Sequence, residues 1–160
     1  MSIRPLSSAE IVEAKKVFRN TLPYGQITIT NALGAGGAPF TIALPTFMGP
    51  WSYQINLGAS GFINGLSMAS TFIHELTHVW QGSHSGFPPN FMLNSLVHQG
   101  IAVLQTGDRN NAYSYTPGAP WGAYNVEQQA HIVQDWYTQG MSFFSVLFRY
   151  VGGNIQTGHN

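Results

Sequence analysis

The middle of the chain contains a strongly helical stretch, FINGLSMASTFIHELTHVW, at residues 62–80. Its apolar side chains recur at alternating steps of four and three residues, the spacing that places them along one face of an α-helix. These positions are Phe62, Leu66, Ala69, Ile73, Leu76 and Trp80. The sequence therefore predicts a central helix that begins near Phe62, against which a small sheet is expected to pack.

An HExxH pattern, His74-Glu75-Leu76-Thr77-His78, lies inside this helix. Residues four apart on a helix lie one turn apart on the same face, so both imidazoles can reach one Zn²⁺ while Glu75 holds the water on the metal. Two core histidines around a structural carboxylate are the alternative. That alternative must explain why Glu75 is the only formally charged residue between Asn20 and Gly107. A zinc ion explains it directly, because the cation compensates a carboxylate that is costly to bury alone.

A catalytic zinc site needs a third protein ligand and one open position, and two residues are candidates. His84 lies ten residues after His74, where metzincin-type motifs have their third histidine, but the glycine that those motifs need three residues after the second histidine is Gln81 here. Glu127 begins a polar stripe on a helix predicted over residues 125–139. A carboxylate from this second helix would complete a His₂Glu site of the thermolysin type. We favour Glu127, and His84 stays open as the alternative.

The residues His74-Glu-Leu-Thr-His-Val-Trp-Gln81, followed by Glu127-Gln-Gln-Ala130, resemble the gluzincin-type metallopeptidase domains found at or near type VI secretion spike (Vgr-related) proteins. The resemblance covers this helix pair and, more loosely, the opening segment Leu6 to Phe18. It implies a zincin-like fold with Glu75 as the general base. It also implies one Zn²⁺ per chain, with three ligands: His74, His78 and Glu127.

The same resemblance implies a zinc-dependent peptidase that hydrolyses peptide bonds in a protein or peptide substrate and acts as a secreted antibacterial effector or toxin. It further implies a secretion-spike partner, an immunity protein, and export through a type VI system into the periplasm of a target cell. Two other functions stay open. One is a non-catalytic, zinc-stabilised docking module of a secretion assembly, against which Glu75 argues because a structural site needs no base. The other is a zinc amidase that acts on cell-wall peptides.

The chain departs from the thermolysin-like pattern at one position. Where those enzymes have an Asp four residues after the ligand Glu, this sequence has His131, which we expect to hydrogen-bond a ligand or to stabilise the transition state. The oxyanion of the tetrahedral intermediate also needs a hydrogen-bond donor. Tyr113, Tyr115 and Tyr124 lie in or beside the segment that precedes Glu127, and we assign this role to Tyr124.

The first half of the chain predicts a helix followed by short strands. Ser7 and Glu10 form a capping box that opens a helix running to about Asn20. Three β-like runs follow, which we expect to form a small antiparallel or mixed sheet, most simply an antiparallel one. The third run is expected to be an edge strand beside the central helix, where a peptide could add to the sheet. These runs are Gln26–Thr30, Phe40–Leu44 and Trp51–Asn56.

The second half predicts only helices, which makes the fold class α+β. One helix is expected after Pro89, with His98 as a structural residue on it, and another over residues 125–139. A third is expected over residues 142–151, ended by the glycines at 152 and 153. Residues 1–151 then form one zincin-like domain, and residues 152–160 a flexible C-terminal tail.

Composition excludes several classes of protein. The 160 residues contain no Cys, which rules out a disulfide scaffold and thiolate metal sites. Six basic residues balance six acidic ones, so there is no positive field to attract nucleic acid. No stretch reaches the roughly 18 uninterrupted apolar residues of a membrane span. The N-terminus lacks the apolar run of a secretory signal, so we expect synthesis in the cytoplasm without a signal peptide.

Overall fold

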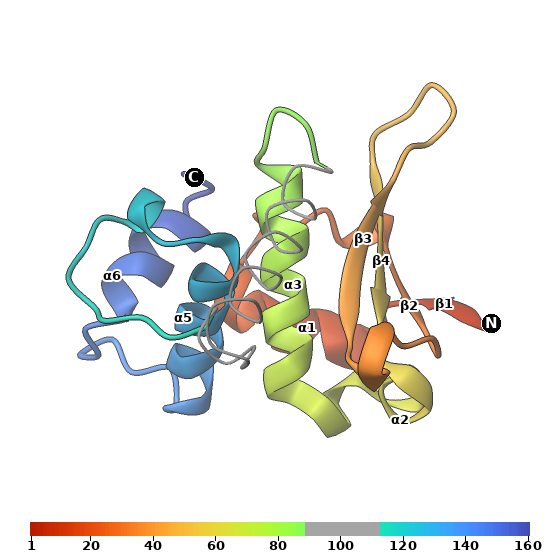
Figure 1. Cartoon of the computed structure of the whole chain (residues 1–160), viewed down its shortest axis with the longest axis horizontal. Coiled ribbons are helices and arrows are strands. Elements are labelled where there is room, and N and C mark those ends of the chain that lie inside the picture. Colours follow the sequence, from red (N-terminus) through yellow and green to blue (C-terminus); the bar gives the residue numbers. More distant parts are fainter. Residues whose placement is uncertain (89–112) are drawn as a thin grey trace.

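The computed structural model describes residues 1–88 and 113–160, which form an α+β structure with a small mixed sheet (Figure 1). β1 pairs antiparallel with β2, and β3 with β4, whereas β2 and β4 run parallel. The strand order is β1-β2-β4-β3. The strands are β1 (Ile3–Pro5), β2 (Ile27–Thr30), β3 (Phe40–Leu44) and β4 (Ser52–Asn56). The predicted α+β class and a mixed sheet are therefore confirmed.

Two expectations about the strands are wrong. The purely antiparallel arrangement fails because β3 lies on the far side of β4, so that β2 and β4 become parallel neighbours with Ile29 opposite Ile55. The run at 51–56 is not an edge strand either: β4 is paired on both sides, and its Tyr53 and Ile55 are buried. In the described part of the chain the edges are β1 and β3, and β3 is the edge that packs beside the central helix.

The central helical segment is interrupted, contrary to the expectation of one helix from Phe62. α2 (Gly58–Ile63) ends at Asn64, whose backbone is extended and whose side chain accepts a hydrogen bond from the Leu66 amide. A short 3₁₀ turn, Gly65–Met68, leads into α3 (Ala69–Ser83). The local bond offered by Asn64 replaces the helical pairing at this point despite the apolar period. α3 then lies between the sheet on one side and α5 (Val126–Thr138) on the other (Figure 1).

The first helix, α1 (Ser8–Phe18), begins with the predicted capping box. Ser7 Oγ accepts a hydrogen bond from the Glu10 amide at 3.2 Å, and Glu10 Oε2 accepts one from the Ser7 amide at 2.7 Å. Glu10 also pairs with Arg4 through two hydrogen bonds of 2.7 and 2.8 Å and accepts one from the Gly65 amide at 2.8 Å. This buried carboxylate thus ties the first strand and α1 to the turn that begins α3.

The predicted helix over 125–139 is confirmed as α5, which Asn125 and Gln128 cap reciprocally and which ends before Gly140 (φ 85°). The helix expected over 142–151 is mostly wrong. Residues 142–147 form turns because the Ser142 and Ser145 hydroxyls accept hydrogen bonds from backbone amides two residues on. Helical structure is confined to α6 (Phe148–Tyr150) and a π-helical turn, Val151–Ile155.

The glycines at 152 and 153 do not end this last helical segment. They lie inside the π-helical turn, and Ile155 beyond them is buried. The Ile155 carbonyl accepts hydrogen bonds from Trp80 Nε1 at 3.1 Å and from Thr21 Oγ1 at 2.8 Å. The packed domain therefore extends through Ile155 rather than stopping at Val151.

The helix expected after Pro89, with His98, falls outside the described residues. In residues 1–88 and 113–160, no helix is both long and apolar enough to cross a bilayer.

Candidate metal centre

α3 and α5 bring two histidines and a carboxylate together. His74 and His78 lie one turn apart on the face of α3 that meets α5, and Glu127 lies in the first turn of α5. Glu127 Oε2 is 3.4 Å from His74 Nε2 and 3.6 Å from His78 Nε2. One ligand atom from each of the three residues lies within 4.8 Å of the others. The two helices therefore join residues that are about fifty positions apart in the chain.

These distances fit a zinc ion. Nitrogen and oxygen ligands about 2.0–2.1 Å from Zn²⁺ in a tetrahedron lie about 3.4 Å from one another. The carboxylate is thus at the separation from both ring nitrogens that a shared zinc would require. Among the described residues, the cluster contains three potential ligands, which leaves one tetrahedral position for a water or a substrate.

The electrostatics of the three residues also suit a cation. Burial opposes a charge on the His78 ring, but the Glu127 carboxylate outweighs burial and raises the pKa of His78 to about 9. Burial likewise opposes ionisation of Glu127, yet the two histidines hold the pKa of Glu127 well below its ordinary value. Glu127 is therefore ionised while only 1% exposed, with the protonated His78 ring as its positive partner. A divalent cation would take over that role and leave both imidazoles neutral as ligands.

A glutamine side chain holds the outer nitrogen of each histidine. His74 Nδ1 lies 3.0 Å from Gln134 Oε1, and His78 Nδ1 lies 2.8 Å from Gln81 Oε1. Gln81 is fixed in turn, because its Nε2 donates to Gln129 Oε1 and to the Val126 carbonyl, both at 2.9 Å. Such outer partners set the tautomer and orientation of a metal-binding histidine. When Nδ1 carries the proton and donates it to the glutamine oxygen, a neutral ring has its lone pair on Nε2. This is the nitrogen that lies close to Glu127 Oε2 in both histidines.

Sequence reasoning did not assign these glutamines, although both have a local signal. Gln81 follows His78 by three residues on the same helix, and Gln134 belongs to the polar stripe that begins at Glu127. The spacing alone could have placed Gln81 beside His78. Gln134 reaches His74 only because α3 and α5 pack together.

Glu75 points away from α5 and toward the sheet. Its Oε2 accepts a hydrogen bond of 2.7 Å from Thr41 Oγ1, on the edge strand β3, and its side chain is buried. The same hydroxyl lies 3.2 Å from the Glu75 carbonyl oxygen. The carboxylate that the sequence assigns as general base is therefore held between α3 and β3, and sequence reasoning missed Thr41 because nothing local links it to the helix.

His131 lies beside the cluster but is not one of its three potential ligands. It lies one turn after Glu127 on α5, and its ring centroid is 6.3 Å from that of His74. Its Nε2 is 3.8 Å from Asp135 Oδ1, and its side chain is 37% exposed. The expected hydrogen bond from His131 to a ligand is not formed, because Gln134 occupies that place on His74.

Tyr124, to which we assign the role of oxyanion donor, is buried in the core. Its hydroxyl is buried in a separate network, where it donates to the Thr116 carbonyl, accepts from the Ala119 amide and lies 3.1 Å from Tyr150 Oη. Tyr113 is the tyrosine beside the cluster, with its ring centroid 6.0 Å from that of His74 and 5.8 Å from that of His131. The short 3₁₀ turn at 121–123 immediately precedes Tyr124, whose side chain packs in the hydrophobic core.

His84, the alternative third ligand, lies outside the cluster. It follows the last residue of α3, where its ring stacks on Trp80 with centroids 4.5 Å apart and its Nδ1 lies 2.8 Å from the Trp80 carbonyl oxygen. α3 ends at Ser83, so the chain turns at His84 toward the C-terminal residues and not toward His74.

Comparison with known proteins agrees with the arrangement of these helices. No protein-family model matches the chain. It is 31% identical over 162 aligned residues to the type VI secretion system spike protein VgrG2b of Pseudomonas aeruginosa, an alignment that covers 98% of this chain and 15% of the spike protein. The solved effector domain of P. aeruginosa VgrG2b matches with a TM-score of 0.58 and 26% identity, over 96% of this chain and 83% of that domain. Homology to the VgrG2b effector domain links this chain to type VI secretion spike-associated proteins.

The relationship to the VgrG2b effector domain extends beyond the two helices that carry His74, His78 and Glu127. Because the aligned region covers nearly the whole chain, it includes the sheet and the C-terminal helical segment, which motif resemblance alone did not reach. The chain corresponds to one domain's share of the much longer spike protein.

Proposed function

We propose that this chain is a gluzincin-type zinc metallopeptidase with a zincin-like fold, which hydrolyses peptide bonds with Glu75 as general base. The observation that carries the proposal is the convergence of His74 Nε2 and His78 Nε2 on Glu127 Oε2 at 3.4 and 3.6 Å. The position of Glu75 adds to it, since a site with only a structural metal would have no use for a buried carboxylate next to the ligands.

Zn²⁺ bound by the three ligands would polarise the scissile carbonyl and lower the pKa of the attacking water. Glu75, held by Thr41, takes the proton of that water and delivers it to the leaving amine. Tyr113 and His131 lie beside His74, where either can donate a hydrogen bond to the developing oxyanion.

The biological role follows from the homology. A domain related to the VgrG2b effector domain is expected to act as an antibacterial effector or toxin that a type VI system exports with a spike partner. The target-cell periplasm would be its site of action, and an immunity protein would protect the producing cell. These expectations belong to the same proposal as the peptidase activity.

The decisive experiment compares the zinc-loaded chain with its Glu75→Gln variant on a denatured protein substrate. Glu75→Gln keeps the size of the side chain, so zinc content should stay unchanged while turnover falls about 10²–10⁴-fold. Glu13→Gln, on α1, serves as the control for the substitution itself. Equal cleavage by parent and Glu75→Gln contradicts the mechanism. Release of cell-wall fragments without protein cleavage would indicate an amidase, and zinc binding without either activity a docking module.

A further inference from the structure

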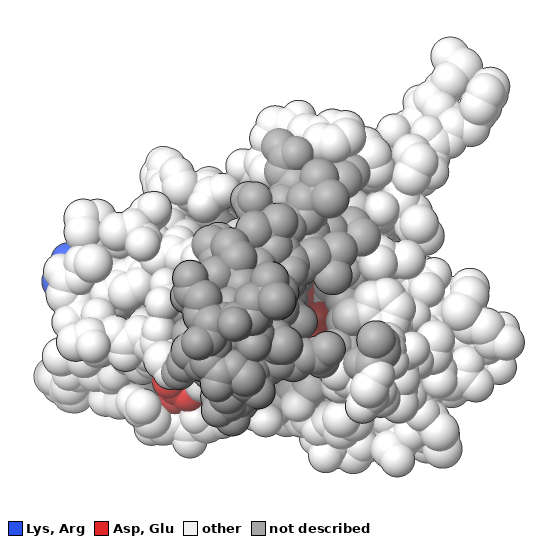
Figure 2. Space-filling model, viewed as in Figure 1, with Lys and Arg blue, Asp and Glu red and all other residues white. Residues whose placement is uncertain are grey.

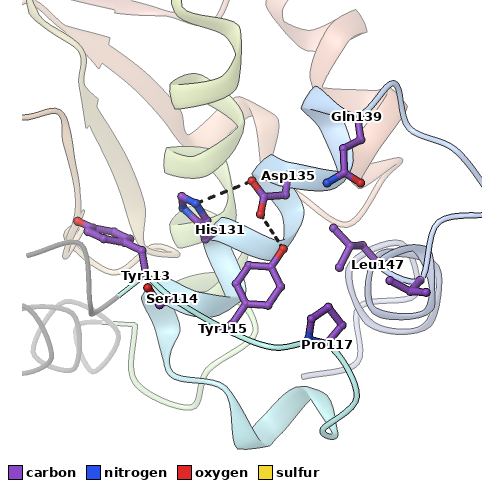
Figure 3. A pocket seen from close by; sticks show the side chains of 9 residues that line it. Tyr113, Ser114, Tyr115, Pro117, His131, Asp135, Gln139 and Leu147 are labelled. Carbon is purple, nitrogen blue, oxygen red and sulfur yellow. Dashed lines mark hydrogen bonds and ion pairs between the residues drawn. The ribbon is translucent and has the colours of Figure 1, made fainter.

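A cavity of about 600 Å³ lies beside the candidate metal ligands, and of its lining residues the proposed mechanism uses only Tyr113 and His131. Figure 3 shows it between one side of α5 and the segment 113–117. α5 contributes His131 and Asp135, which project from successive turns. The facing walls include two aromatic rings and two apolar side chains, from Tyr113, Tyr115, Pro117 and Leu147.

The cavity lies directly beside the three candidate metal ligands. His131, on its rim, lies one turn beyond Glu127, and the rings of His131 and Tyr113 are 6.3 and 6.0 Å from the ring of His74. A peptide whose scissile bond lies at the three ligands can therefore place a neighbouring side chain in this space. The cavity is a candidate subsite of the proposed peptidase.

The charge of the cavity lining comes from one carboxylate, that of Asp135. Of the described residues that line the cavity, Asp135 is the only Asp, Glu, Lys or Arg, and its side chain is 33% exposed. In Figure 2, few of the visible described atoms belong to charged residues. Tyr115 Oη donates a hydrogen bond of 2.6 Å to Asp135 Oδ2 and fixes its orientation.

The second oxygen of Asp135 accepts no hydrogen bond from the described residues. Oδ1 lies 3.8 Å from His131 Nε2, an ion pair when that ring is protonated but too long for a hydrogen bond, so a cationic ligand can approach this oxygen more closely. Burial and the hydrogen bond to Asp135 both raise the pKa of Tyr115, so Tyr115 remains a neutral donor and adds no negative charge of its own. The cavity thus offers one oriented anionic oxygen beside aromatic and aliphatic walls.

We infer that this cavity binds a lysine or arginine side chain of the substrate, so that the enzyme cleaves peptides with a basic residue at one position near the scissile bond. The carboxylate pairs with the ammonium or guanidinium group, the tyrosine rings attract the same cation, and Pro117 and Leu147 pack on the aliphatic stem. This inference rests on the proposed peptidase function.

Cleavage-site profiling tests the preference. A peptide library is digested with the zinc-loaded parent, and the cleaved bonds are identified by mass spectrometry. We expect Lys and Arg to be enriched at a single position, and matched peptides with Lys there to have kcat/KM about 10-fold above those with norleucine. Asp135→Asn should reduce this ratio below about 2-fold.

Glu13→Gln is the matched control. It also neutralises a carboxylate that accepts a tyrosine hydrogen bond, because Tyr137 Oη donates to Glu13 Oε1 at 2.9 Å, but Glu13 is not a lining residue. The Lys preference should survive in Glu13→Gln. A preference that also survives in Asp135→Asn, or a parent that prefers neutral or acidic residues, overturns the inference.

A binding measurement separates this inference from the peptidase proposal. Calorimetry of the uncleaving Glu75→Gln variant should give a Kd about 10-fold lower for the Lys peptide than for the norleucine peptide, and the difference should disappear in Glu75→Gln/Asp135→Asn. Selective binding without cleavage by the parent would contradict the peptidase and retain the cationic subsite. Cleavage by the parent with equal binding of both peptides would retain the peptidase and overturn the subsite. Circular dichroism of each variant checks that loss of binding is not loss of fold.

Discussion

Thr41 Oγ1 donates a 2.7 Å hydrogen bond to Glu75 Oε2 and so connects the edge strand of the sheet to the carboxylate of the HExxH helix. Both side chains are buried. A hydrogen bond to an ionised carboxylate is short and fixes its direction, and a buried carboxylate without such a partner is unfavourable. The sheet therefore takes part in the candidate site through one hydroxyl.

Thr41→Val should lower kcat about 10-fold and leave the zinc content unchanged, because valine keeps the shape of threonine but cannot orient Glu75. Steady-state cleavage rates and elemental analysis measure the two effects. Thr28→Val on the neighbouring strand β2 is the control, since the Thr28 hydroxyl faces the Tyr53 carbonyl and not the site. An unchanged kcat in Thr41→Val would show that Thr41 does not position the base.

Zinc content should depend on Glu127 and not on His84. The parent and His84→Ala should each retain about one zinc per chain after purification, whereas Glu127→Ala should lose most of it, because removal of the carboxylate leaves two neutral ligands. Elemental analysis of the three proteins, purified side by side, makes the comparison. Zinc lost from His84→Ala but kept by Glu127→Ala would require a different third ligand.

Gln81→Leu should weaken zinc binding about 10–100-fold, the usual effect of removing the partner that orients a metal-binding histidine. Leucine fills much the same space but leaves His78 Nδ1 without its acceptor. A competition titration against a chromophoric chelator gives the affinity. Gln54→Leu, which removes a buried glutamine that bonds Asn56 within the sheet, should bind zinc like the parent; equal losses in both variants would point to general destabilisation.

The two tyrosine positions should respond differently. Tyr113→Phe should lower kcat with little change in melting temperature, since Tyr113 lies beside His74. Tyr124→Phe should do the reverse, because the Tyr124 hydroxyl bonds Thr116 and Ala119 within the core and its loss leaves those groups unpaired. Rates and thermal melts of both variants test the pair. A Tyr124→Phe protein with normal stability and reduced kcat would restore the sequence assignment.

Because of Glu10, the free energy of unfolding should decrease as the pH falls. Burial opposes its ionisation, but the hydrogen bonds from Arg4, Ser7 and Gly65 lower the pKa of Glu10 to about 2. A carboxyl with a lowered folded-state pKa stabilises the protein above its ordinary pKa, and this stabilisation is lost as pH falls from about 4.5 toward 2. Urea unfolding at pH 7 and pH 3 should show a parent that is about 1–3 kcal/mol more stable than Glu10→Gln at pH 7.

The difference between parent and Glu10→Gln should shrink at pH 3, where Glu10 is almost fully protonated in the unfolded chain but still mostly ionised in the folded one. Glu13→Gln is the comparison on the same helix, because Glu13 pairs with the exposed Lys16 and should have the smaller effect. A pH-independent difference between parent and Glu10→Gln would mean that the charge of Glu10 is not what stabilises this junction.

Local sequence determined the parts of this protein whose partners lie within one helical turn. The capping boxes at Ser7 and Asn125 and the i, i+4 spacing of His74 and His78 need only the backbone of their own helix. The expected helix start at Phe62 failed for an equally local reason, the capping side chain of Asn64. The absence of the metzincin glycine at Gln81 and the polar stripe of the second helix favoured Glu127 over His84, and the resemblance to known domains implied the same ligand.

Only the tertiary structure decided which distant residues meet. The parallel pairing of β2 with β4 depends on β3 lying outside β4, and the choice of Thr41, Gln134 and Tyr113 as neighbours of the HExxH residues depends on how the sheet and α5 pack on α3. The sequence does not show that such distant residues meet. They are brought together when whole helices and strands pack to bury their apolar surfaces. Helix geometry placed the two imidazoles on one face, and packing supplied the carboxylate, the hydroxyl and the amides that complete the site.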